Sequence, residues 1–145
     1  MFNYKNLSKR IKSNEGFRKK YYLDKLGNKT IGYGHLIKES EKFLLLGQHS
    51  KKKLDLIFYN DLRDAIKIYK KHYNKYKLST KAQEVIIEMI FQLGIKGVLS
   101  FKEFNKHIIN GNNYLAAIEM LNSKWYKQTP RRVKKLIAFL VYEHD

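Results

Sequence analysis

Residues 14–35 read NEGFRKKYYLDKLGNKTIGYGH, and this stretch sets the local structure of the first part of the chain. A short run with helical period precedes it and predicts a helix that ends at Gly16, a residue type that commonly terminates helices. Aromatic and β-branched residues are then interrupted by Asp, Asn and Gly, which is typical of β-hairpins with tight turns. We therefore expect Glu15 at the C-terminal end of a helix, and Asp24 and Thr30 on the outgoing and returning arms of a hairpin.

Glu15, Asp24 and Thr30 are the side chains of this stretch that can carry chemistry together. Two carboxyl groups that face each other across a cleft, with a positioned water, are what hydrolysis of a glycosidic bond with inversion requires. Each residue also has an ordinary interpretation: a Glu that faces solvent, an Asp that only shapes a turn, and a Thr that only suits a strand. The joint spacing of the three, rather than any one of them, favours the catalytic interpretation.

The rest of the chain is predicted to be helical. Ser50 is a suitable N-cap for a long amphipathic helix over residues 51–72. Ser79 or Thr80 can cap a largely apolar helix that stops at Gly94, and Pro130 suits the first turn of the last helix. Shorter segments with helical period lie at residues 101–109, 114–121 and 131–141.

Composition limits the class of protein. At 145 residues, of which 43% are hydrophobic, the chain is expected to form one domain, residues 1–145, with a substantial core. The absence of cysteine excludes disulfides and thiolate metal sites. A formal net charge of +17 attracts polyanions, a class that includes nucleic acid, teichoic acid, anionic lipid and the carboxylates of peptidoglycan. No apolar run is suited to a signal peptide or to a membrane span, so we expect a soluble protein.

The spacing Glu-x8-Asp-x5-Thr, followed by Ile-Gly-Tyr-Gly-His at residues 31–35, resembles the active-site signature of the phage-type lysozymes, the bacteriophage endolysin family (glycoside hydrolase family 24). FQLG at residues 91–94 and SKWYKQTP at residues 123–130 resemble later motifs of that family, so the resemblance covers nearly the whole chain. It implies an α+β, lysozyme-like fold with a small N-terminal β-hairpin lobe and a larger all-helical C-terminal lobe, joined by a long helix. The expected bounds are about residues 13–50 for the small lobe, about 51–72 for the connecting helix, and about 73–145, with the N-terminal helix, for the helical lobe.

The resemblance also implies roles for single residues. The residue that matches Glu15 is the general acid, the one that matches Asp24 activates water, and the one that matches Thr30 holds that water. The residues that match sugar-contacting positions are Gly34, Phe91, Gln92 and Trp125. A lone Trp in a domain is more often part of the core than a ligand platform, so a structural role is the alternative for Trp125.

Three further residues match structural positions of the family. His35 and Asp61 match an ion pair that joins the hairpin to the long helix. Arg132 matches an arginine that approaches the catalytic Glu, where a cation favours the ionised form of the acid. No other His lies at ligand spacing from His35, so we expect no metal, and the family's chemistry needs no cofactor.

Glu88 departs from the family's pattern, in which Asn or Ser is usual. It lies inside the apolar run from Val85 to Phe91, where a carboxyl must find a partner. Asn14 and Lys135 depart as well, because an Asp and an Arg are expected there. These departures affect the expected width of the cleft and the substrate preference, not the catalytic residues.

We therefore expect an inverting, endo-acting muramidase that hydrolyses the β-1,4 linkage between N-acetylmuramic acid and N-acetylglucosamine in bacterial peptidoglycan and causes cell lysis. Its partners would be peptidoglycan and, by charge, anionic cell-wall or membrane surfaces; it would be a monomer without sequence-specific binding of nucleic acid. It would be made in the cytoplasm of a bacterial host without a signal peptide and act on the wall after release. The alternatives are a non-catalytic cationic binder of nucleic acid or anionic membrane, using YKKHYNKYK at residues 69–77, and a structural wall-binding protein with a lysozyme fold.

Overall fold

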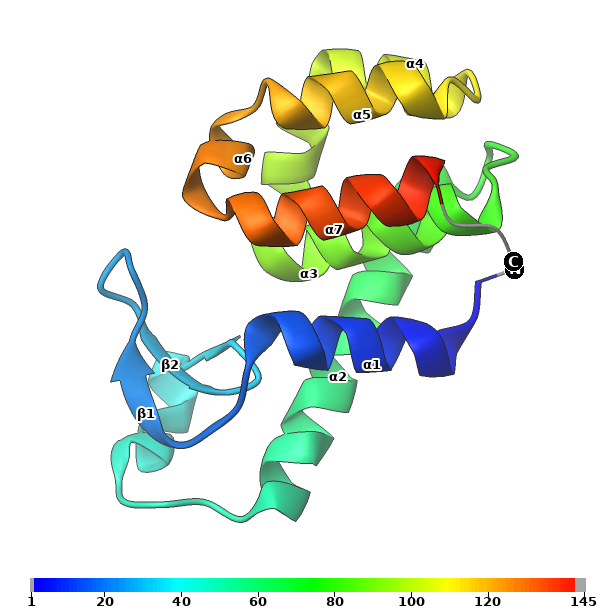
Figure 1. The fold of residues 1–145 in the computed structure, drawn as a ribbon. Coiled ribbons are helices and arrows are strands. Elements are labelled where there is room, and N and C mark those ends of the chain that lie inside the picture. The colour runs from blue at the N-terminus through cyan, green and yellow to red at the C-terminus, as the bar shows by residue number, and fades with distance from the viewer. Residues whose placement is uncertain (1, 143–145) are drawn as a thin grey trace. The chain divides into compact units, whose positions relative to one another are not determined.

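The computed structural model describes residues 2–142, which form a small antiparallel sheet and a larger set of helices (Figure 1). This arrangement confirms the predicted α+β, lysozyme-like fold. In chain order the elements are α1 (Tyr4–Glu15), β1 (Arg18–Leu23), β2 (Lys29–Gly32), β3 (His35–Leu36), the 3₁₀ helix η1 (Glu39–Leu45), α2 (Lys51–Tyr73), α3 (Thr80–Ser100), α4 (Lys102–Ile109), α5 (Asn113–Leu121), α6 (Lys124–Gln128) and α7 (Pro130–Val141).

The chain divides into two compact units. The sheet unit is the continuous stretch Ser8–Asp64, with the three strands, η1, most of α1 and the first part of α2. The helical unit contains the residues up to Leu7 together with the chain from Ala65 onward. Both passages between the units therefore lie inside helices, one in α1 and one in α2.

The sheet unit has a small core beneath its strands. The strand order is β1-β2-β3, and both pairings are antiparallel. Ile31, Leu44 and Leu54 form a buried cluster to which the sheet, η1 and α2 each contribute one residue. Ser50 caps α2, since its Oγ accepts a hydrogen bond from the backbone N–H of Lys53 at 3.2 Å, as the sequence predicted.

The helical unit is built around α3, which is buried along most of its first half. Ser79 caps this helix by accepting from the backbone N–H of Ala82 at 3.2 Å. At Gly94 the backbone leaves the helical conformation (φ +78°), which is where the sequence predicted the stop, but a further helical segment follows directly to Ser100. Figure 1 shows α7 beside α3, with α4 and α5 as an outer layer of this unit.

None of the helices within residues 2–142 is both long enough and apolar enough to cross a bilayer.

Candidate active site

Glu15 is the last residue of α1, and its side chain is half-buried. The backbone turns away at Gly16 (φ +74°), whose N–H still donates to the carbonyl of Lys12 at 3.1 Å. The turn between β2 and β3 places Gly34 against this side chain, so that a Cβ built on Gly34 would lie 2.4 Å from Glu15 Oε1. The space beside the Gly34 Cα therefore holds the Glu15 carboxyl, which any side chain at position 34 would displace.

Asp24 directly follows β1 and shapes the hairpin turn with both carboxylate oxygens. Its Oδ1 accepts from the backbone N–H groups of Leu26 (2.9 Å) and Asn28 (2.8 Å), and its Oδ2 accepts from Asn28 Nδ2 (3.2 Å). The hydrogen bond from the Asn28 backbone is the main reason that the pKa of Asp24 is lowered. Asp24 is thus a partly exposed carboxylate that stays ionised at neutral pH, and its turn role is compatible with accepting a proton from water.

Thr30 lies on β2, opposite Tyr22 of β1 in the strand pairing. Its side chain is almost fully buried, and its Oγ1 donates to the carbonyl oxygen of Asn28 at 2.9 Å. Because the hydroxyl proton is used within the hairpin, the oxygen lone pairs are what Thr30 can offer to a water molecule.

Tyr22 is a member of this group that the sequence did not lead us to predict. Burial raises the pKa of the Tyr22 phenol, and the negative charges of Glu15 and Asp24 raise it further, so the phenol lies in the field of both carboxyl groups. The guanidinium of Arg18 lies over the same ring, 4.6 Å from its centroid. The sequence did contain a signal for Tyr22: residues 22 and 24 are two apart at the end of a predicted strand, and side chains two apart in a strand lie on the same face.

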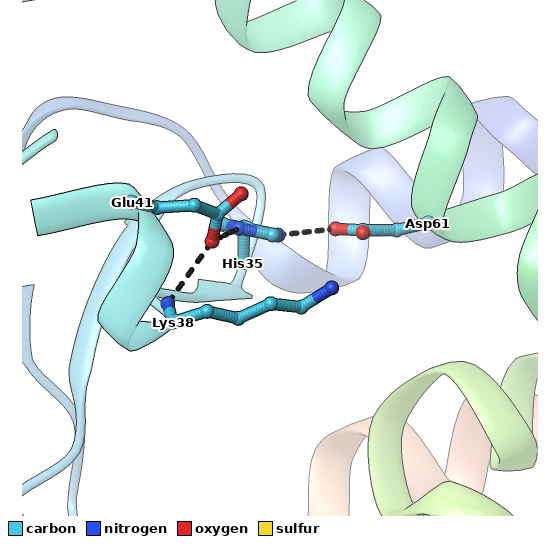
Figure 2. A network of polar contacts seen from close by, with 4 residues as sticks. All are labelled: His35, Lys38, Glu41 and Asp61. Atoms are coloured by element: carbon cyan, nitrogen blue, oxygen red, sulfur yellow. Dashed lines mark hydrogen bonds and ion pairs between the residues drawn. The ribbon is translucent and has the colours of Figure 1, made fainter.

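His35 connects three elements of the sheet unit (Figure 2). Its Nδ1 lies 2.7 Å from Asp61 Oδ2 on α2, so the predicted pair is present. Its Nε2 lies 2.9 Å from Glu41 Oε1 on η1, a second carboxylate that the sequence did not predict. Glu41 in turn accepts from the backbone N–H of Lys38 at 3.0 Å. The histidine ring is therefore held between two acidic groups from opposite sides.

The two carboxylates favour the charged form of His35. Burial of the ring opposes the charge, but hydrogen bonds to Asp61 and Glu41 outweigh burial and raise the pKa of His35. For Glu41, burial likewise opposes the charge, while the Lys38 N–H and the His35 ring together lower its pKa. Among residues 2–142 no group of three or more His, Asp or Glu side chains is arranged so that it could hold a metal ion.

In the helical unit, Gln92 and Trp125 bind each other. Trp125 is only 2% exposed, its indole stacks on Phe101 with ring centroids 6.2 Å apart, and its Nε1 donates to Gln92 Oε1 at 2.9 Å. Gln92 Nε2 donates to Thr129 Oγ1 at 3.4 Å. This burial supports the structural interpretation of Trp125, with Gln92 holding the indole in place. Phe91, the neighbour of Gln92, is half-buried.

Glu88 and Arg132 form a buried ion pair between α3 and α7. Arg132 Nε donates to Glu88 Oε2 at 3.0 Å, and the side chains are 9% and 0% exposed. The carboxyl at position 88 thus has the partner that its burial demands. The sequence had predicted Arg132 as a neighbour of the catalytic Glu, and the structure gives its guanidinium this acidic partner within the helical unit.

The predicted site residues fall into two groups, one in each unit. Within the sheet unit lie Glu15, Asp24, Thr30, Gly34, His35 and Asp61; within the helical unit lie Phe91, Gln92, Trp125 and Arg132.

Comparison with known proteins identifies the family to which this chain belongs. A family model described as phage lysozyme matches residues 12–138. Two proteins of Dictyostelium discoideum, named "Probable T4-type lysozyme 1" and "Probable T4-type lysozyme 2", are 33% and 32% identical to this chain over 90% and 92% of its length and the same shares of their own. The pre-baseplate central spike protein Gp5 of Enterobacteria phage T4 is 25% identical over 94% of this chain, a match that covers 28% of that protein.

The chain belongs to the phage lysozyme family, as its sequence motifs indicated. It is therefore a glycoside hydrolase of the lysozyme type, and its substrate is peptidoglycan.

Proposed function

We propose that the chain is an endo-acting, inverting muramidase that hydrolyses the β-1,4 linkage between N-acetylmuramic acid and N-acetylglucosamine. The observation that carries this proposal is the contrast between its two carboxyl groups. Asp24 is fixed as an ionised acceptor by N–H groups of its turn, whereas Glu15 is half-buried at the carbonyl end of α1, where negative charge is disfavoured. Such a contrast separates the group that accepts a proton from the group that donates one.

In this mechanism Glu15 gives its proton to the glycosidic oxygen as the bond between that oxygen and the anomeric carbon breaks. A water molecule attacks the anomeric carbon from the opposite face, and its proton passes to Asp24. Thr30 holds this water through the lone pairs of its hydroxyl oxygen. Room for the water requires the two carboxyl groups to lie about 6.5–9.5 Å apart.

Replacement of Glu15 by Gln tests the proposal, because it removes the transferable proton and hardly changes the shape of the side chain. We expect cleavage of purified peptidoglycan to fall by at least about 100- to 10,000-fold, the range of general acid catalysis. Glu39→Gln is the matched control, since it makes the same change of charge at a side chain that is 90% exposed in the same unit. Near-normal lysis by Glu15→Gln, with normal activity of the control, would refute the catalytic assignment and favour a binding protein.

The stereochemistry of the product tests inversion separately. NMR of the reducing end, recorded before mutarotation, should show the anomer opposite to that of the substrate linkage. The retained anomer would point to a covalent intermediate instead.

We further propose that the net charge of +17 increases capture of anionic wall material by a monomeric enzyme. Long-range attraction is screened over a Debye length of about 8 Å at physiological salt, whereas contacts in the active site are short. Lysis of whole walls should therefore decrease with added salt, while cleavage of a neutral muro-oligosaccharide changes little. Equal salt dependence of the two reactions would contradict a capture role for the charge.

A further inference from the structure

Helix α5 presents an apolar face to solvent. Its buried side contains Ala116, Ala117 and Met120, as expected for a helix that packs on its neighbours. Its exposed residues, however, are all hydrophobic. They are Tyr114 (63% exposed), Leu115 (42%), Ile118 (47%) and Leu121 (44%).

These four residues form one continuous surface, which we call the α5 face. Tyr114, Ile118 and Leu121 follow at helical spacing along one side of α5, and Leu115 lies beside Ile118 at a spacing of three. The ring of Tyr114 contacts the ring of Tyr142, with centroids 6.4 Å apart, and Tyr142 is 64% exposed. The apolar surface therefore extends from α5 to the end of α7. Contiguous exposed apolar surface of this kind marks an interaction site more often than a scattered leucine does.

The helices that pack against α5 carry mostly positive charge. Helices α4, α6 and α7 contact α5; α6 and α7 contain no acidic residue, whereas α4 contains Glu103 and α5 itself contains Glu119. The exposed basic residues of α6 and α7 are Lys124, Lys127, Arg131, Lys134 and Lys135, so the helices next to α5 are basic on balance. An exposed apolar helix face with Tyr at its edge, next to helices rich in exposed Lys and Arg, has the composition of surfaces that lie in the interface of an anionic membrane.

We propose that the α5 face inserts into the headgroup region of anionic lipid bilayers. Basic residues of α6 and α7 would contact lipid phosphates, while Ile118 and its apolar neighbours enter the boundary with the acyl chains. A second copy of the chain is the less suitable occupant, because pairing through this face would bring two cationic surfaces together. This proposal concerns the outer layer of the helical unit and does not depend on catalysis.

Binding to lipid vesicles tests the proposal in the full chain. Leu115→Gln combined with Ile118→Gln removes apolar surface at exposed helix positions and keeps good helix propensity. We expect this double variant to bind phosphatidylglycerol vesicles at least about tenfold more weakly than wild type, because each side chain loses part of its apolar transfer free energy. The matched control is Leu46→Gln combined with Leu56→Gln, two exposed leucines of the sheet unit, which should leave binding unchanged. Both variants should keep wild-type melting curves and wild-type cleavage of a soluble oligosaccharide.

Depth measurement distinguishes insertion from adsorption by charge. The chain has no cysteine, so a nitroxide can be attached through Ile118→Cys or, as the control, through Leu56→Cys. With vesicles added, the label at position 118 should become more accessible to oxygen and less accessible to a polar nickel complex, and the control label should not change. The proposal is overturned if the double variant binds as tightly as wild type, or if the label at position 118 stays equally accessible to the nickel complex. It is also overturned if sedimentation shows a dimer that the double variant abolishes, since the face would then be a contact between copies.

Discussion

Gly34→Ala should show whether the position of the Glu15 carboxyl, the proposed general acid, affects activity independently of the stability of the fold. The new Cβ would stand 2.4 Å from Oε1 and 2.9 Å from Cδ of Glu15, whereas ordinary contact begins at 3.4 Å. The carboxyl must therefore move by about 1 Å, a displacement that can cost about 100-fold in rate. The backbone adds a second cost, because Gly34 has φ +75°, and a side chain in this region costs about 1–2 kcal/mol.

Gly111→Ala is the matched control for the backbone cost. Gly111 has φ +78°, but a Cβ there meets nothing within 4 Å. Both variants should lose similar stability in urea unfolding, while only Gly34→Ala should lose about 100-fold in cleavage of peptidoglycan at a temperature where both are folded. Normal activity of Gly34→Ala, or an equal loss in the two variants, would refute the view that position 34 acts through Glu15.

Two further predictions concern the ion pairs. His35→Asn should lower the free energy of unfolding most at pH 5–6. The raised pKa of His35 gives stability that is full below the unfolded value of about 6.5 and is lost as pH rises through the folded pKa, whereas Glu41, whose pKa is lowered, loses its contribution only as pH falls through its own folded pKa. Thermal melts equal to wild type at pH 5–6 would contradict this. Arg132→Met should lower the free energy of unfolding in urea by about 3–5 kcal/mol, and adding Glu88→Leu should recover much of that loss. Removing one member of a buried ion pair is costly, but replacing both members by apolar residues often is not. A double variant no more stable than Arg132→Met would show that the pair does not act as a unit.

The long elements and most of their ends were predictable from the sequence, because their signals are local; α3 is the exception, since a helical segment to Ser100 follows its predicted stop at Gly94. Gly16 ends α1, Ser50 begins α2 and Pro130 begins α7, each at the position that its backbone chemistry favours. The pair of His35 and Asp61 was predictable only through the family resemblance, since the residues are distant in sequence and only the docking of α2 brings them together.

Two of the short helices, η1 and α6, were not predicted. The segment from Glu39 to Leu45 and the five residues of α6 are too short to show a period, and each contains one fully or nearly fully buried residue, Leu44 or Trp125. Their structure depends on tertiary packing, which also explains why Glu41 was missed. It contacts His35 only because η1 turns its carboxylate towards the ring.

The turn that holds Asp24 also makes the two oxygens of its carboxylate inequivalent. A carboxylate offers about four acceptor sites, two on each oxygen. Leu26 and Asn28 occupy both sites of Oδ1, and the Asn28 side chain occupies one site of Oδ2. Oδ1 thus accepts from two backbone N–H groups, whereas Oδ2 accepts from one side-chain amide, so Oδ2 has more capacity left for a water molecule. In the proposed mechanism the attacking water would therefore bind on the Oδ2 side of Asp24 and reach the sugar from that direction.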